Sequence, residues 1–195
     1  PTLIDGGTSY SKISTGAGHT CGIVTGTGAL KCWGGNGLGT IGDGTTTDRS
    51  SPTLIDAGTS YAQIAAGSSH SCGIVSGTGA LKCWGYNSNG LIGDGTYTNR
   101  LVPVVVDAGT SYVQVSVGYD HTCGITSANL LKCWGSNSFG QQGNGGSFTY
   151  YLPTQASPGF APLQLSLASA ATCALNGTGA LYCWGKNDYG VLGDG

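Results

Sequence analysis

Charged side chains are scarce in this sequence. Its 195 residues include nine aspartates, no glutamate and only seven lysines and arginines, so 8% of the side chains are charged and the formal net charge is −2. Binding to a nucleic-acid backbone depends on clustered cations, and this chain offers no such cluster. We therefore exclude nucleic acid as a partner.

Methionine is absent, and so is any long apolar run. A helix that spans a membrane needs about 20 consecutive apolar residues, whereas 37 glycines and many serines and threonines interrupt this chain throughout. That composition is typical of a turn-rich protein with little helix, and it predicts no membrane span. Because the chain starts at a repeat boundary and lacks methionine, we expect it to be a piece of a longer protein.

The sequence does contain one unit written four times. Its starts recur at Pro1, Pro52, Pro103 and Pro153, and 34 of 51 positions are identical between the first two copies. Self-similarity at this period indicates a repeat architecture. We predict a single repeat array over residues 1–195, with repeats at 1–51, 52–102 and 103–152 and an incomplete fourth at 153–195.

Each repeat holds one pair of cysteines. In the first copy, residues 21–32 are typical of a hairpin whose two-residue loop is Gly26-Thr27. That register sets Cys21 opposite Cys32, at a separation that a disulfide accommodates. In copies three and four the loop changes to three residues ending at Asn129 and Gly179, and the two cysteines remain opposite each other. The predicted disulfides are Cys21–Cys32, Cys72–Cys83, Cys123–Cys133 and Cys173–Cys183.

Eight cysteines in such pairs indicate an oxidising compartment, and we predict a secreted or cell-surface protein. The alternative is structural zinc, since His19, His70 and His121 each lie two residues before a cysteine. Against zinc, the fourth copy has Ala171 at that place and the chain lacks the CxxC spacing of zinc sites. Turn-capping by Asp43 and its equivalents is favoured over calcium binding. We predict no cofactor and no metal.

The pattern within one repeat predicts strands at 10–14, 19–25, 29–33 and 52–55. Both faces of the hairpin are largely apolar, which is typical of a sheet packed between two neighbours. The four tryptophans are therefore expected in the core. They are Trp33, Trp84, Trp134 and Trp184.

Two motifs recur with these features: Gly-x-x-His-Ser/Thr-Cys, and Gly-x-Leu-x-Cys-Trp-Gly-x-Asn followed by Gly-Asp-Gly-Thr. They resemble the regulator of chromosome condensation repeat, in the Cys-Trp-Gly form common in bacterial secreted and surface proteins. The matching stretches are 16–21 with 29–44, 67–72 with 80–95, 118–123 with 130–145, and more weakly 168–173 with 180–195.

The resemblance implies an all-β fold, made of four-stranded antiparallel blades of a β-propeller. Seven blades are usual in the family, so four copies leave open a longer chain, several chains completing one another, or an incomplete ring or open array. The family's nuclear nucleotide-exchange role does not suit an acidic chain with paired cysteines. A secreted relative of similar fold inhibits β-lactamase through its ring face.

Recognition is expected where the copies differ, because shared positions build the scaffold. Aromatic residues set among small polar ones resemble binding surfaces, and packing between blades is the alternative role for them. The candidate binding residues are Tyr86, Tyr97, Phe139, Phe148, Tyr150, Tyr151 and Tyr189.

No arrangement of catalytic residues stands out, so we predict that the chain is not an enzyme. The leading hypothesis is an extracellular scaffold or interaction module, part of a surface protein, adhesin or fibre (filament). The alternative is a secreted binding or inhibitory propeller. The predicted partner is a protein, either another copy in self-assembly or a different protein, or a glycan.

Overall fold

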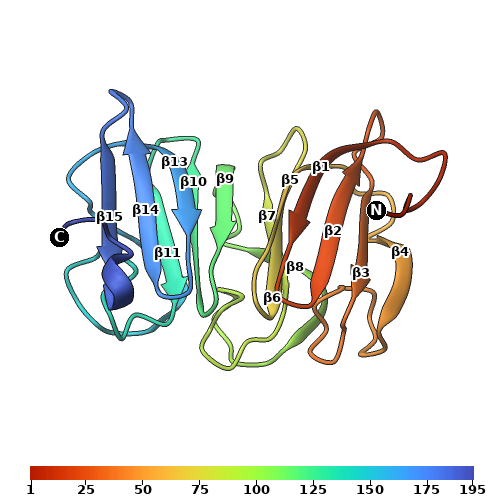
Figure 1. Ribbon diagram of the computed structural model, residues 1–195, viewed down its shortest axis with the longest axis horizontal. Coiled ribbons are helices and arrows are strands. Elements are labelled where there is room, and N and C mark those ends of the chain that lie inside the picture. Colours follow the sequence, from red (N-terminus) through yellow and green to blue (C-terminus); the bar gives the residue numbers. More distant parts are fainter.

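The computed structural model describes residues 1–195, which form four antiparallel sheets in succession along the chain (Figure 1). The first sheet holds β1 (Tyr10–Thr15), β2 (His19–Val24), β3 (Leu30–Gly34) and β4 (Arg49–Ile55). The second holds β5 (Tyr61–Ala66), β6 (His70–Val75), β7 (Leu81–Gly85) and β8 (Arg100–Val106). The third holds β9 (Tyr112–Val117), β10 (His121–Thr126), β11 (Leu131–Gly135) and β12 (Tyr150–Gln155). The fourth holds β13 (Pro162–Leu167), β14 (Ala171–Asn176) and β15 (Leu181–Gly185).

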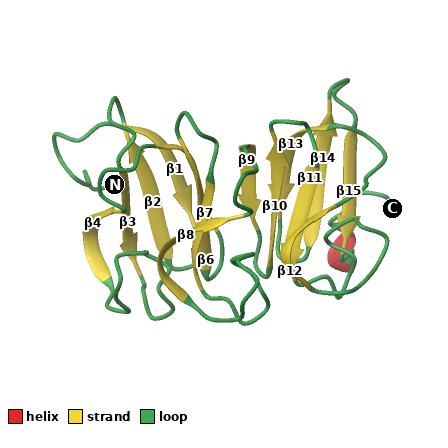
Figure 2. Ribbon diagram, turned by 180° about the vertical axis from the view of Figure 1, so that it is seen from behind, coloured by secondary structure: helices red, strands yellow, loops and turns green.

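The only helix is a short 3-10 turn, η1 (Asp188–Gly190), drawn in red in Figure 2. No helix in the structure has the length and apolar character that crossing a bilayer requires. The predicted strands are confirmed to within about a residue at most ends, although β4 begins at Arg49, three residues before its predicted start. The predicted four-stranded blades are confirmed for the first three sheets.

Each of the outer strands β4, β8 and β12 contains the proline that starts the following repeat. A blade is therefore completed by residues of the next repeat. Proline is tolerated there because an edge strand leaves one row of amides unpaired. The strands β1, β5, β9 and β13 contact one another in succession, which makes them the inner strands of an arc. The two termini lie at opposite ends of this arc (Figure 1).

The hydrophobic core lies between the sheets. In one cluster, Ile23 and Leu30 of the first blade pack with Tyr61, Ile64 and Trp84 of the second. Equivalent clusters join the second blade to the third and the third to the fourth. Trp84 and Trp134 are fully buried, as expected, whereas Trp33 and Trp184 in the end blades are partly exposed.

All four predicted cysteine pairs are joined as disulfides, each with 4.1 Å between Cα atoms. The predicted three-residue turns are confirmed: Thr126 pairs with Leu130 around one, and Asn176 with Ala180 around the other. The predicted two-residue turn in the first copy is wrong. The hairpin closes at Val24 and Ala29 instead, because the Thr25 amide donates to Ser9 and does not pair with Gly28.

Neighbouring blades are held together by a repeated joint. At the first joint, His19 Nε2 lies 2.7 Å from Ser71 Oγ, and Ser71 Oγ donates to the Thr40 carbonyl. That carbonyl also accepts from Trp84 Nε1 at 2.9 Å. Because the Ser71 hydroxyl hydrogen is used by the carbonyl, His19 must donate through Nε2. His70 and His121 repeat the contact with Thr122 and Thr172.

The histidines are therefore buried hydrogen-bonding residues, as expected, and they serve the joints between blades. Their Nε2 atoms are engaged with hydroxyl groups and the cysteines with one another, so the zinc alternative does not describe this arrangement.

Candidate functional site

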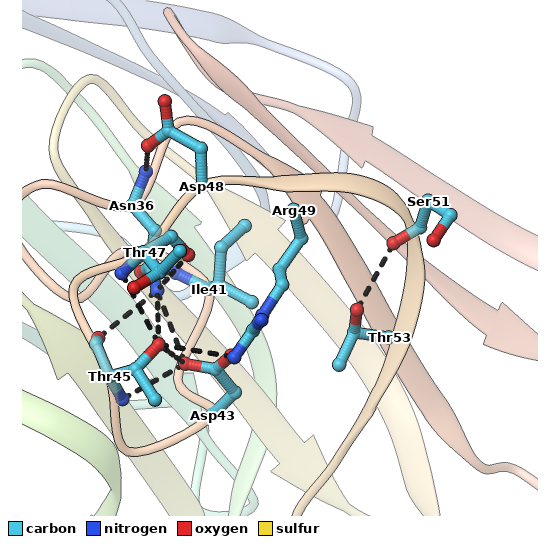
Figure 3. Close-up of polar contacts among 9 residues, drawn as sticks. All are labelled: Asn36, Ile41, Asp43, Thr45, Thr47, Asp48, Arg49, Ser51 and Thr53. Carbon is cyan, nitrogen blue, oxygen red and sulfur yellow. Dashed lines mark hydrogen bonds and ion pairs between the residues drawn. The ribbon is translucent and has the colours of Figure 1, made fainter.

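In each of the first three blades, the loop between the third and fourth strands projects from the strand ends opposite the hairpin turn. In the first blade this loop is organised by the buried Asn36, shown in Figure 3. Its Nδ2 donates to the Asp43 carboxylate and to the carbonyls of Thr45 and Thr47. Its Oδ1 accepts from the Ile41 amide at 3.0 Å. One amide side chain thus fixes both halves of the loop.

Asp43 supplies the second anchor of this loop. Its carboxylate accepts from Thr45 and pairs with Arg49 at the start of β4 (Figure 3). Burial raises the pKa of Asp43, but the hydrogen bonds from Thr45, Arg49 and Asn36 outweigh it and hold the pKa below its ordinary value. With its oxygens engaged by protein donors, this carboxylate caps the turn, as expected.

The second blade repeats this loop, with Asn87 bonding Asp94, Thr96 and Thr98 and Arg100 pairing with Asp94. The third blade departs from it. Asn144, Gly146 and Tyr150 replace the aspartate, the first threonine and the arginine, so the ion pair is lost. Asn137 keeps its bonds to Asn144, Gly146 and Gln142, but it no longer reaches the carbonyl at position 148.

This difference predicts unequal costs for the same substitution in two blades. Asn87→Ala leaves the buried Ile92 amide and two partly buried carbonyls without a partner. It should lower the free energy of unfolding by about 2 kcal/mol, whereas Asn137→Ala should cost about 1 kcal/mol. Urea denaturation of the two variants measures the difference. Equal costs would show that the third loop is held as firmly as the second.

The third blade, whose loop loses scaffold bonds, carries exposed aromatic side chains in that loop and at the start of β12. Phe148 is 77% exposed and Tyr151 is 43% exposed. Tyr151 packs against Tyr97 of the second blade, with 5.4 Å between ring centroids. Leu152, which is 52% exposed, lies beside Gly95 of the same neighbouring loop. We call these three residues, Tyr97, Tyr151 and Leu152, together with Phe148 of the loop that precedes β12, the aromatic rim.

The other candidate binding residues do not join this group. Phe139 lies near the fourth blade, where Lys186 Nζ sits 4.8 Å from its ring centroid. Tyr189 is fully exposed on η1, and Tyr86 and Tyr150 are half-buried. Sequence reasoning missed Leu152, whose only signal is its place beside the aromatic pair.

A second contact missed from the sequence is a latch between blades. Asp56, at the end of β4, accepts from Tyr61 and from Lys82 of the next blade, at 2.7 and 2.6 Å. Asp5 and Asp107 make the same contacts, and all three aspartates have positive φ. Burial raises the pKa of Asp56, but the hydrogen bonds from Lys82 and Tyr61 have the larger effect, so the pKa lies below its ordinary value. The sequence does contain a signal for this contact: an Asp, a Tyr and a Lys recur at fixed places in three repeats.

The Regulator of chromosome condensation (RCC1) repeat matches residues 27–74 and 78–125, and a second description of the same repeat matches 61–91, 112–141 and 169–191. The Ultraviolet-B receptor UVR8 of Arabidopsis thaliana is 34% identical over 119 residues, which cover 59% of this chain and 27% of the receptor.

Two crystal structures share the fold. Human WBSCR16 has a TM-score of 0.84 at 22% identity, covering 98% of this chain and 50% of that one. Yeast RCC1 (Prp20) bound to Kap60 has a TM-score of 0.78 at 20% identity, covering 93% of this chain and 43% of that one. The chain thus spans about a quarter of the plant receptor and about half of each structure. These similarities confirm the predicted propeller-type blades.

Proposed function

Since this chain belongs to the regulator of chromosome condensation repeat family, we propose that it is a non-enzymatic module that binds a protein through the aromatic rim. The observation that carries this proposal is the change in the third loop. An ion pair shared by the first two blades is replaced there, and the same segment gains Phe148 and Tyr151 at the surface. Exposed aromatic groups beside small polar residues supply contact area at little cost in rotamer entropy.

We place this module outside the reducing interior of the cell, as a secreted or surface-exposed scaffold. Four disulfides support that placement, because thiols are kept reduced in the cytosol. The absence of enzymatic activity is proposed from the burial of the histidines, whose Nε2 atoms are engaged in the joints between blades. A protein partner is favoured because the yeast relative was crystallised with Kap60.

A displayed library of random peptides tests the rim without a known ligand. Peptides selected on the wild-type chain should lose at least tenfold in affinity for the triple variant Tyr97→Ser, Phe148→Ser, Tyr151→Ser. The melting temperature should change little, since all three side chains are exposed. Leu130→Ser, 40% exposed beside a hairpin turn at the opposite strand ends, is the matched control. If the selected peptides bound the wild-type chain, the triple variant and Leu130→Ser with equal affinity, the binding surface would lie outside the aromatic rim.

A further inference from the structure

Asparagine followed by glycine occurs four times in the chain, and the surroundings of these pairs differ. In such a pair the backbone nitrogen of the glycine can attack the side-chain amide of the asparagine, because glycine has no Cβ to hinder the approach. The attack needs a glycine amide that is not engaged, an asparagine Nδ2 that can leave, and donors for the oxygen that gains negative charge. The four pairs are Asn36-Gly37, Asn89-Gly90, Asn144-Gly145 and Asn176-Gly177.

The first three pairs are each held against this attack. Asn36 is fully buried, and its Nδ2 donates to a carboxylate and to two carbonyls. The amide of Gly90 donates to the Asn87 carbonyl at 2.9 Å, so its nitrogen is not available to Asn89. Nδ2 of Asn144 donates to a neighbouring glutamine at 3.4 Å. In each pair, one of the reacting groups is tied to a neighbour.

The fourth pair meets all three requirements. Asn176 ends β14 at the hairpin turn, and its Oδ1 accepts from the Thr178 amide at 3.0 Å, the Thr178 hydroxyl at 2.7 Å and the Ala180 amide at 2.9 Å. The Gly177 amide and Nδ2 of Asn176 donate to no other group of the chain. An added Cβ at Gly177 would meet no atom within 4 Å, so the nitrogen is open to solvent and to movement.

The same turn is found in the third blade, which is packed between two neighbours. There the Thr126 hydroxyl accepts from the Leu130 amide at 3.1 Å, as Asn176 accepts from its equivalent. Residues 127–130 of that turn are exposed as well. Thr172, which shares a face of β14 with Asn176, bonds the third blade. The arrangement around Asn176 is therefore that of an interior blade.

We propose that Asn176 is a site of self-modification, at which the side-chain amide is lost as ammonia. The Gly177 nitrogen gives its proton to water, and its electron pair forms a bond to Cγ of Asn176. Negative charge gathers on Oδ1, where the three donors stabilise it as an oxyanion hole does. The bond from Cγ to Nδ2 then breaks, and Nδ2 takes up a proton from water and leaves as ammonia.

The product of this step is a five-membered imide, which a water molecule opens to an aspartyl or an isoaspartyl residue. The net reaction consumes water and releases ammonia, and it adds one negative charge to the formal net charge of −2. The aspartyl product can still accept from Thr178 and Ala180, whereas the isoaspartyl product lengthens the backbone within the turn. This proposal is independent of the aromatic rim.

Peptide mapping by mass spectrometry tests the site on the purified chain held at mildly alkaline pH. Asn176 should convert about tenfold faster than the other three asparagines, and Thr178→Val should slow it about tenfold by removing one donor to Oδ1. Thr178→Ser keeps the hydroxyl and should convert like wild type. If Asn89 or Asn144 converted first, or if Thr178→Val converted at the wild-type rate, the proposal would be overturned.

A second variant tests which atom attacks. Gly177→Ala should also slow the conversion about tenfold, because its Cβ hinders the approach of the backbone nitrogen to Cγ. The substitution fits the fold, since φ of Gly177 lies outside the left-handed region and the space around it is open. An unchanged rate in this variant would show that water attacks Cγ directly, and the proposed route would then be wrong.

Discussion

In reductant, the protein is expected to lose most of its thermal stability. Each disulfide closes a loop of 10 or 11 residues, and by the chain-entropy argument such a loop contributes about 3 kcal/mol. Four of them amount to about as much as the whole free energy of unfolding of an ordinary domain. Calorimetry of the chain, after denaturation and refolding with or without reductant, measures the loss.

Replacing the cysteines two at a time measures the contribution of each disulfide to stability. Replacing Cys72 and Cys83 by alanine should cost more than replacing Cys173 and Cys183. The first pair is fully buried between two blades, where truncation also leaves a cavity, whereas the second pair lies partly exposed in the end blade. A chain that melts at the same temperature after complete reduction would contradict the stapling role and remove the main support for an extracellular setting.

The strand registers could be predicted because the sequence constrains them twice. The alternation of side chains in residues 19–33 sets which residues share a face, and the Cys21–Cys32 pair then admits one alignment of the two strands. The deletion in the third and fourth copies was absorbed in the turn, as its positive-φ residues Asn129 and Gly179 indicated. Local chemistry was sufficient in each case.

What escaped prediction depends on partners distant in sequence. In the first turn, which is wider than predicted, the Gly28 carbonyl accepts from the Tyr61 amide of the next blade and so does not pair with Thr25. The joint between His19 and Ser71 and the latch between Asp56 and Lys82 likewise cross from one blade to another. Composition and periodicity describe a blade, and they do not specify how two blades meet.

The aromatic rim could be predicted only in part. Tyr97 and Tyr151 were selected because they differ between copies, and the structure brings their rings together across two blades. Phe139 and Tyr189 were selected by the same rule, yet they lie apart from that pair, near the fourth blade. Variation between repeats marks positions freed from the scaffold, and only packing shows which of them share a surface.

Acid should destabilise the fold through its buried histidines at a higher pH than through its aspartates. Burial lowers the pKa of His19 to about 4 and, together with the neighbouring histidines, that of His70 to about 3. Nδ1 of His70 is buried without a partner, so a proton placed there would carry an unsolvated charge. Unfolded histidines titrate near 6.5, and the unfolded state therefore binds more protons between that pH and about 4.

Stability accordingly rises with pH across that interval and is lost as the pH falls through it. At His19 alone the shift corresponds to at most about 3 kcal/mol. The aspartates with lowered pKa values, such as Asp43 and Asp56, lose their contribution only below about pH 4, since their unfolded value is near 3.9.

Urea denaturation from pH 7 to pH 4 should therefore show a steep loss of stability. His70→Gln should make this loss smaller, because glutamine can still donate to Thr122 but does not titrate. The comparison is with Asp120→Asn, which removes a partly exposed carboxylate near His121 and leaves His70 in place. This variant should keep the steep dependence. A wild-type profile that is flat above pH 4 would mean that the buried imidazoles find a solvated path for the proton, and the joints would then be insensitive to acid.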